Sequence, residues 1–158
     1  MTKLKLNTDV PTEIRMTRDF AAPRRLVHRA MSEPELIKKW QGNSCSPIVS
    51  VEVDFRVGGK YRYVYQIPGG NEFFFDGEYK EISEARTVHT EHFNGMPEGA
   101  VVTTTLVDNG NSTTTMTVVM AFSSQDIRDQ VVKTGMEKGA AESYDNLDNL
   151  VGELRRNL

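Results

Sequence analysis

The sequence predicts an α+β domain in which an antiparallel β-sheet carries a long C-terminal helix on one face. Apolar residues recur at every second position through much of the segment 48–122, and turn-forming residues divide that segment into short runs. After residue 123 the apolar spacing changes to three or four residues, which is the period of a helix. A series of strands followed by a helix is typical of an antiparallel sheet with the helix packed on it.

The N-terminal part predicts one strand and two short helices. Alternation over residues 12–20 indicates the strand. Pro23 then suits the first turn of a helix, where its missing N–H costs no hydrogen bond, and apolar residues within 26–30 form the inner face. Pro34 suits the first turn of a second helix, which ends near Trp40.

Six further strands follow, separated by turns. The turns are Gly58-Gly59, the segment 68–71 and the segment 108–111, and the last two have the composition of hairpin turns. Threonine-rich runs near the end suit strands because β-branched side chains pack well on a pleated surface. The expected strands cover residues 48–53, 61–65, 73–79, 87–93, 101–107 and 113–122.

The remainder of the chain predicts a long helix with a bend. Ser123 or Ser124 can cap its start, and Thr134-Gly135 marks the bend. After the bend one apolar stripe continues at helical spacing. The stripe consists of Met136, Ala140, Tyr144, Leu147, Val151 and Leu154.

Composition limits what the chain can be. The 158 residues carry a net charge of −3 and are 38% hydrophobic, which suits one domain over 1–158 and argues against disorder. No apolar run is long enough for a membrane span, and the segment 1–10 lacks the apolar stretch of a secretory signal, so we expect a cytoplasmic protein. The single Cys45 excludes an internal disulfide framework, and the acidic balance argues against nucleic-acid binding.

Several short motifs, in order, resemble the START-like, birch-pollen-allergen-like superfamily, also called the SRPBCC group. Within that group the chain is most similar to homologues of the activator of the heat-shock-protein-90 ATPase. The matching segments span about nine-tenths of the chain, and their ordered set is what makes the resemblance specific. They are Phe20-Ala21-Ala22-Pro23, the segment 32–36 with Trp40, the segment 54–59, the segment 77–82 and the terminal helix from Gly135-Met136 to 150.

The resemblance implies a helix-grip fold: a curved antiparallel sheet wrapped around a long C-terminal helix, with two short helices after the first strand. Members of the superfamily bind lipids, polyketides, flavonoid-like aromatics or hormones, some are cyclases, and others assist a chaperone. This chain departs from the superfamily pattern at two positions that affect how much space is left in the interior. Many members carry a tryptophan after the glycine of the last helix and a second aromatic after the early tryptophan, where this chain has Ala140 and Gln41. The smaller side chain at 140 favours a cavity between helix and sheet.

Aromatic and methionine side chains on inward faces are the strongest signal of a site. They combine an apolar body with a few polar tips or an adaptable shape, as small-molecule pockets do. The same residues could instead fill an ordinary core. The side chains expected to contact a ligand are Trp40, Tyr61, Tyr63, Tyr65, Phe73, Phe75, His92, Met116, Met136, Ala140 and Tyr144.

Catalytic residues are not identified by any motif. Strand alternation places His92 inward with Val88 and Thr90 and places His89 and Glu91 outward, so the two histidines cannot share a metal. His92 is therefore the one acid–base candidate, although its pattern favours an ordinary half-buried strand histidine over a catalytic one. His28 is expected on the surface, and Cys45 has no adjacent histidine in the sequence.

These observations favour binding of an apolar or aromatic small molecule, of lipid, polyketide or flavonoid type, between the sheet and the last helix. The alternatives are an interaction module that activates a chaperone ATPase and a cyclase- or hydrolase-like enzyme that uses the same cavity. We expect no metal, no cofactor, no nucleic acid and no membrane span. The protein is expected to be a monomer or a homodimer.

Overall fold

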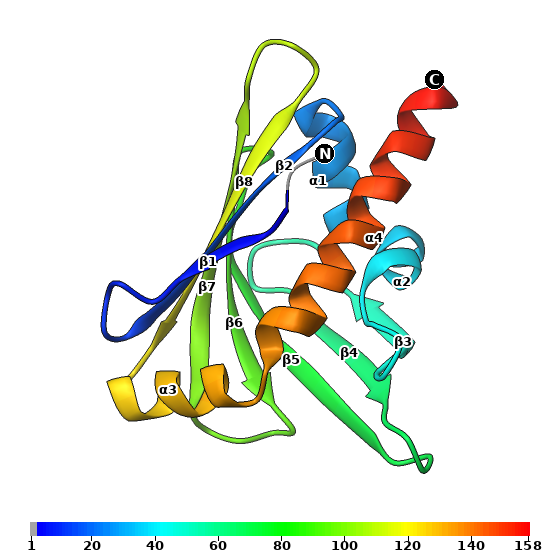
Figure 1. The fold of residues 1–158 in the computed structure, drawn as a ribbon. Helices are drawn as coiled ribbons and strands as arrows, with labels where there is room; N and C mark the ends of the chain where they lie inside the picture. Colours follow the sequence, from blue (N-terminus) through cyan, green and yellow to red (C-terminus); the bar gives the residue numbers. More distant parts are fainter. Residues whose placement is uncertain (1–2) are drawn as a thin grey trace.

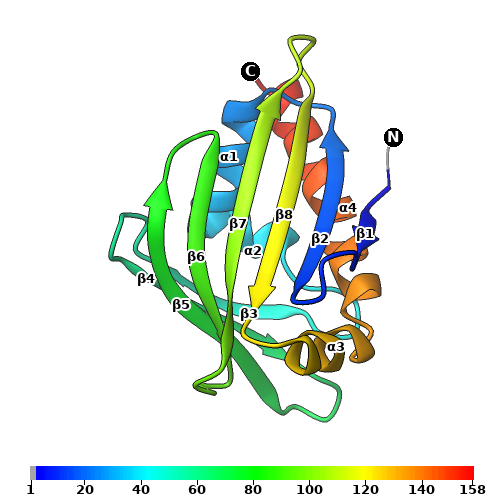
Figure 2. The ribbon, with the colours of Figure 1, turned by 90° about the vertical axis from the view of Figure 1, so that its left-hand side faces the viewer.

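The computed structural model describes residues 3–158 and confirms the predicted α+β helix-grip architecture (Figure 1). One eight-stranded antiparallel sheet has the strand order β1-β2-β8-β7-β6-β5-β4-β3. The sheet curves around the long helix α4 (Met136–Arg156) (Figure 2). The strands are β1 (Lys5–Asn7), β2 (Glu13–Phe20), β3 (Ile48–Val53), β4 (Lys60–Gln66), β5 (Glu72–Ile82), β6 (Arg86–Phe93), β7 (Gly99–Asp108) and β8 (Thr114–Phe122).

The helices follow the predicted order. Helices α1 (Arg24–Ser32) and α2 (Pro34–Trp40) lie between β2 and β3, and Pro34 occupies the first turn of α2 as expected. The predicted bend divides the C-terminal segment into α3 (Gln125–Lys133) and α4, because Gly135 has a φ of 78°, in the left-handed region that glycine adopts without strain. The Ser124 hydroxyl accepts a hydrogen bond from the Ile127 N–H at 3.2 Å and caps α3.

Strand β1 was not predicted. It has three residues and pairs with β2 in the register Leu6 to Met16. Leu6 is the one apolar side chain in it, so the segment offers no alternation from which a strand could be inferred.

One half of the interior is solidly packed. Here α1 and the C-terminal half of α4 lie against the inward faces of β2, β7 and β8, and the side chains exclude water almost completely. An ion-pair cluster joins the two layers: the buried Arg18 guanidinium of β2 contacts the buried carboxylate of Asp148 and the exposed carboxylate of Asp145, both on α4. The members of this packed half with 0–1% exposure include Ile14, Phe20, Leu26, Val27, Met116, Leu147 and Val151.

Candidate functional site: a cavity between the sheet and helix α4

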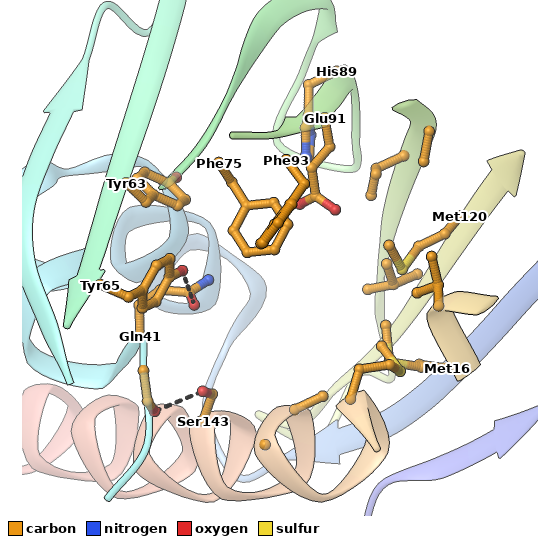
Figure 3. A pocket seen from close by; sticks show the side chains of 18 of the residues that line it. Met16, Gln41, Tyr63, Tyr65, Phe75, His89, Glu91, Phe93, Met120 and Ser143 are labelled. Atoms are coloured by element: carbon orange, nitrogen blue, oxygen red, sulfur yellow. Dashed lines mark hydrogen bonds between the residues drawn. The ribbon is translucent and has the colours of Figure 1, made fainter. Parts of the chain in front are cut away.

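The other half of the interior is hollow. A cavity of about 1290 Å³ lies between the inward faces of β4–β8 and the N-terminal half of α4. The loop 41–46 and the side chains of His28 and Met31 from α1 close further parts of its wall. Figure 3 shows aromatic rings along one side and methionine side chains along the other.

The aromatic wall is built by register between neighbouring strands. Tyr63 of β4 pairs with Phe75 of β5, which pairs with Phe93 of β6, so three rings occupy one row. Tyr65 pairs with Phe73 in the next row, and their rings stack with centroids 5.1 Å apart. Side chains two residues apart on a strand share a face, so the alternation seen in the sequence produces this continuous surface.

A gap in that wall lets Tyr61 reach across the sheet. Tyr61 pairs with Gly77 on β5, and its hydroxyl donates to the backbone oxygen of Thr90 on β6 at 2.7 Å. A Cβ atom on Gly77 would lie 1.9 Å from that same Thr90 oxygen. Glycine at 77 is therefore required by the close approach of β5 to β6.

The helix and the loop 41–46 form the opposite wall. The Tyr144 ring of α4 stacks on Trp40, with centroids 5.8 Å apart, and the Trp40 indole N–H donates to the Ala30 oxygen at 2.8 Å. The Ser143 hydroxyl donates to the Gly42 oxygen at 2.7 Å and fixes the loop to the helix. Gln41 accepts a hydrogen bond from the Tyr65 hydroxyl at 3.2 Å, so the residue at this unusual position links the loop to β4 (Figure 3).

Small residues on α4 keep this wall thin. Ala140 lines the cavity, as do Met136 and Gly139. A Cβ atom on Gly139 would lie 2.9 Å from the Asn43 side-chain nitrogen, so the loop packs directly on the helix backbone there. A tryptophan after the glycine would project from position 140, where the cavity now is.

Glu91 is the most unusual polar group of the site. It projects from β6 into the cavity between His89 and Phe93, which share its face of the strand (Figure 3). Within residues 3–158 its carboxyl group has no hydrogen bond and no ion pair. Burial raises the pKa of Glu91 from 4.5 to about 7, because desolvation disfavours the charged form. The pKa values of Tyr61 on β4 and Tyr144 on α4 are raised mainly by burial. The negative charge of Glu91 raises both of them further.

His89 lies beside Glu91 on the same face of β6 and is half-buried. Its ring meets the Tyr61 ring edge-on, with centroids 5.2 Å apart, and its Nδ1 has no hydrogen-bond partner among the described residues. Burial lowers the pKa of His89 from 6.5 to about 4. The imidazole is therefore neutral at neutral pH and supplies no positive charge to Glu91.

The tyrosine hydroxyls of the site are neutral at neutral pH. Burial raises the pKa of Tyr79 to about 12 and holds the pKa values of Tyr63 and Tyr144 well above the ordinary value. The wall therefore presents neutral hydroxyls and aromatic faces, with Glu91 as its deep acidic group.

Most of the predicted ligand-contacting residues lie on the cavity wall, and their contact with a ligand stays a prediction. Trp40 contributes a side chain that is only 2% exposed, so it supports Tyr144 more than it faces the cavity. Those on the wall are Trp40, Tyr61, Tyr63, Tyr65, Phe73, Phe75, Met136, Ala140 and Tyr144.

The inward placement of His92 was wrong. His92 pairs with Asp76 and Gly99 on the outer face of the sheet, and its Nδ1 lies 3.1 Å from the Met96 oxygen. The inward positions of β6 are instead those of His89, Glu91 and Phe93. Their pairing with the inward residues of β5 fixes this face, and Phe93 was the residue in the sequence whose aromatic side chain could have shown it.

Met116 and His28 were also misplaced. Met116 faces inward but lies in the packed half of the interior with 0% exposure, and Met120 takes the position on the cavity wall. Strand alternation gives the face of a side chain but not its position along the strand, and these two methionines share a face. His28 is half-buried rather than exposed and packs edge-on against Phe55, with centroids 5.5 Å apart, at the cavity wall.

Metal ligands do not gather in the part of the chain that the structure describes: no three side chains of histidine, cysteine, aspartate or glutamate come together over residues 3–158. Over the same residues, every helix is too short or too polar to cross a membrane.

The fold and the cavity together define a helix-grip domain of the SRPBCC superfamily. Residues 21–152 match the family described as "Activator of Hsp90 ATPase homolog 1-like protein", and the chain belongs to that family. Curated proteins, by contrast, provide no match.

Solved structures of the same fold come from several bacteria. A protein from Rhodobacter sphaeroides has a TM-score of 0.88 at 21% identity, over 96% of this chain and 99% of that one. The NE0264 protein from Nitrosomonas europaea has a TM-score of 0.84 at 26% identity, over 94% and 99%. DynU16, described as a protein in the dynemicin biosynthetic locus, has a TM-score of 0.69 at 20% identity, over 89% of this chain and 47% of its own.

Proposed function

We propose that this protein binds an apolar or aromatic small molecule in the cavity between the sheet and α4. The observation that carries the proposal is the hollow half of the interior, about 1290 Å³ in volume and walled by aromatic rings and methionines. A void of this size forfeits dispersion contacts that a filled core would have. A bound molecule that fills it would restore those contacts, and the tyrosine hydroxyls would orient its polar atoms.

The origin of one protein with this fold agrees with the proposal. DynU16 comes from a biosynthetic locus, and such a locus handles small organic molecules. The aromatic wall of this chain would suit a flat ring system, because offset-stacked and edge-on arrangements with Tyr65, Phe73 and Phe75 are available.

Filling the cavity from the helix side tests the proposal. In Ala140→Trp the indole would occupy the space next to Tyr144, and the fluorescent alcohol 4-(pyren-1-yl)butan-1-ol should bind at least about tenfold more weakly than to the native chain. The measurement is a fluorescence titration at fixed protein concentration.

The matched control is Glu153→Trp, which adds the same side chain to an exposed position of α4. It should leave the affinity for the pyrene alcohol unchanged. Equal affinities of the native chain and Ala140→Trp would contradict the proposal, as would the absence of saturable binding to the native chain.

A further inference from the structure

The structure places a carboxyl group that has no hydrogen bond or ion pair among residues 3–158 on the wall of a largely apolar cavity, and this arrangement needs an explanation. Glu91 is the group concerned, and the side chains that share its face of β6 are His89 and Phe93. Leaving a buried carboxylate without a partner is costly, whereas a paired and hydrogen-bonded one is tolerated. A glutamate that served only to fill space would be replaced at lower cost by an apolar side chain.

No cation of the described residues compensates Glu91. Arg86 lines the cavity but forms its ion pair with Glu81, and Lys138 is exposed at the start of α4. His89 is neutral at neutral pH, because burial lowers its pKa to about 4. The compensating positive charge is therefore not supplied by residues 3–158.

The surroundings of Glu91 suit an organic cation. Tyr61 and Tyr65 of β4 and Tyr144 of α4 line the same cavity. The charge of Glu91 contributes to raising the pKa of each of these tyrosines. Phe75 and Phe93 form an edge-on pair in the adjacent row, with centroids 5.4 Å apart. Aromatic faces attract cations through the ring quadrupole, and the attraction is larger when water is excluded.

We propose that the cavity is selective for hydrophobic amines, with the ligand ammonium group paired to the Glu91 carboxylate and its apolar body against the aromatic wall. This inference rests on the proposed function and names the ligand class of the same site. An ammonium donor to a carboxylate makes a charge-assisted hydrogen bond, which is stronger than a neutral one. A hydrocarbon or aromatic body of the amine would bury its surface against Phe73, Phe75 and Met120.

The test compares three probes with one skeleton: the pyrenyl butanol, 4-(pyren-1-yl)butan-1-amine and 4-(pyren-1-yl)butanoic acid. With the native chain at about pH 8 the amine should bind at least about tenfold more tightly than the alcohol, and the acid more weakly than the alcohol. Glu91→Gln should bring the amine to within about threefold of the alcohol when both are titrated against the same variant. A second neutral variant, Glu91→Met, should show the same loss of amine preference.

The control for general electrostatic attraction is Glu72→Gln, which removes one negative charge from the exposed rim of the same cavity. This variant should keep the preference for the amine. An amine that binds no better than the alcohol would overturn the amine assignment and leave the pocket function standing, as would a preference that persists in both Glu91 variants. Absence of saturable binding by both alcohol and amine would overturn the pocket function, and the amine assignment with it.

Discussion

At the scale of single residues, Glu91 and His89 make opposite contributions to the pH dependence of stability. Burial raises the Glu91 pKa from 4.5 to about 7, so the folded state holds a proton that the unfolded state releases. Stability from this group is present below about pH 4.5 and is lost as the pH rises through 7. The His89 pKa is lowered from 6.5 to about 4, so its contribution is present above 6.5 and is lost as the pH falls through 4.

Glu91→Gln should therefore become more stable than the native chain as the pH rises. Between about pH 5 and pH 8 we expect the difference in free energy of unfolding to move by about 1–3 kcal/mol in favour of the variant, because the amide never ionises in the cavity. Urea unfolding at several pH values measures this difference. His89→Gln should show a shift of the opposite sign between about pH 4 and pH 6.5. A difference that does not change with pH would show that Glu91 is not desolvated.

At the scale of elements, strands β5 and β6 depend on the missing side chain of Gly77. The close approach lets Tyr61 donate to Thr90 across β5 and lets the Thr90 hydroxyl accept from the Glu78 N–H at 3.0 Å. The register also shifts further along the same pair of strands, between Tyr79 and Glu81. These features set which side chains of β6 reach the cavity.

Gly77→Ala should destabilise the protein, because the new methyl group would lie 1.9 Å from the Thr90 oxygen and the strands would have to separate. We expect a loss of about 2 kcal/mol or more in urea unfolding. Gly152→Ala is the control: in α4 the new methyl group would have an ordinary contact, 3.5 Å from the Arg156 guanidinium. That substitution should stabilise by about 0.5–1 kcal/mol. A Gly77→Ala protein as stable as the native chain would contradict the role of the close approach.

The elements that could be predicted from the sequence are those with a clear period. Strands with tyrosine or phenylalanine at every second position, such as β4 and β5, show their inward face directly. In β6 the two faces carry Thr, His, Glu and Phe on one side and Arg, Val, Thr and His on the other. The polarity of the residues does not show which face of β6 points inward, because the inward face lines a cavity whose wall includes polar side chains. The residue most relevant to the site, Glu91, was therefore placed outward.

At the scale of the whole molecule, the interior is divided into a packed half and a hollow half. Met116 and Met120 lie on the same face of β8: Met116 lies within the packed half, and Met120 lies at its boundary, where it also lines the cavity. The ion pairs of Arg18 with Asp145 and Asp148 hold the packed half together across the sheet and α4. Position along the strand, which alternation does not reveal, decides which half a side chain joins.

The two methionines should differ in what their truncation costs. Met116→Ala leaves a new void among fully buried side chains and should lower the free energy of unfolding by about 3 kcal/mol. Met120→Ala extends a cavity that already exists, so we expect a loss of about 1 kcal/mol. Chemical denaturation of both variants compares them directly. Equal losses would show that the cavity wall is as tightly packed as the rest of the core.

The divided interior also bears on how such a protein changes over evolution. Substitutions on the aromatic wall, at positions such as Phe73 or Phe75, reshape the cavity without disturbing the side chains that hold the sheet to α4. Selection for a new ligand and selection for a stable fold then act on sets of residues that overlap only in part. A scaffold arranged in this way can diverge in sequence and in what it binds while its architecture stays constant, and structures about 21–26% identical to this chain do keep that architecture.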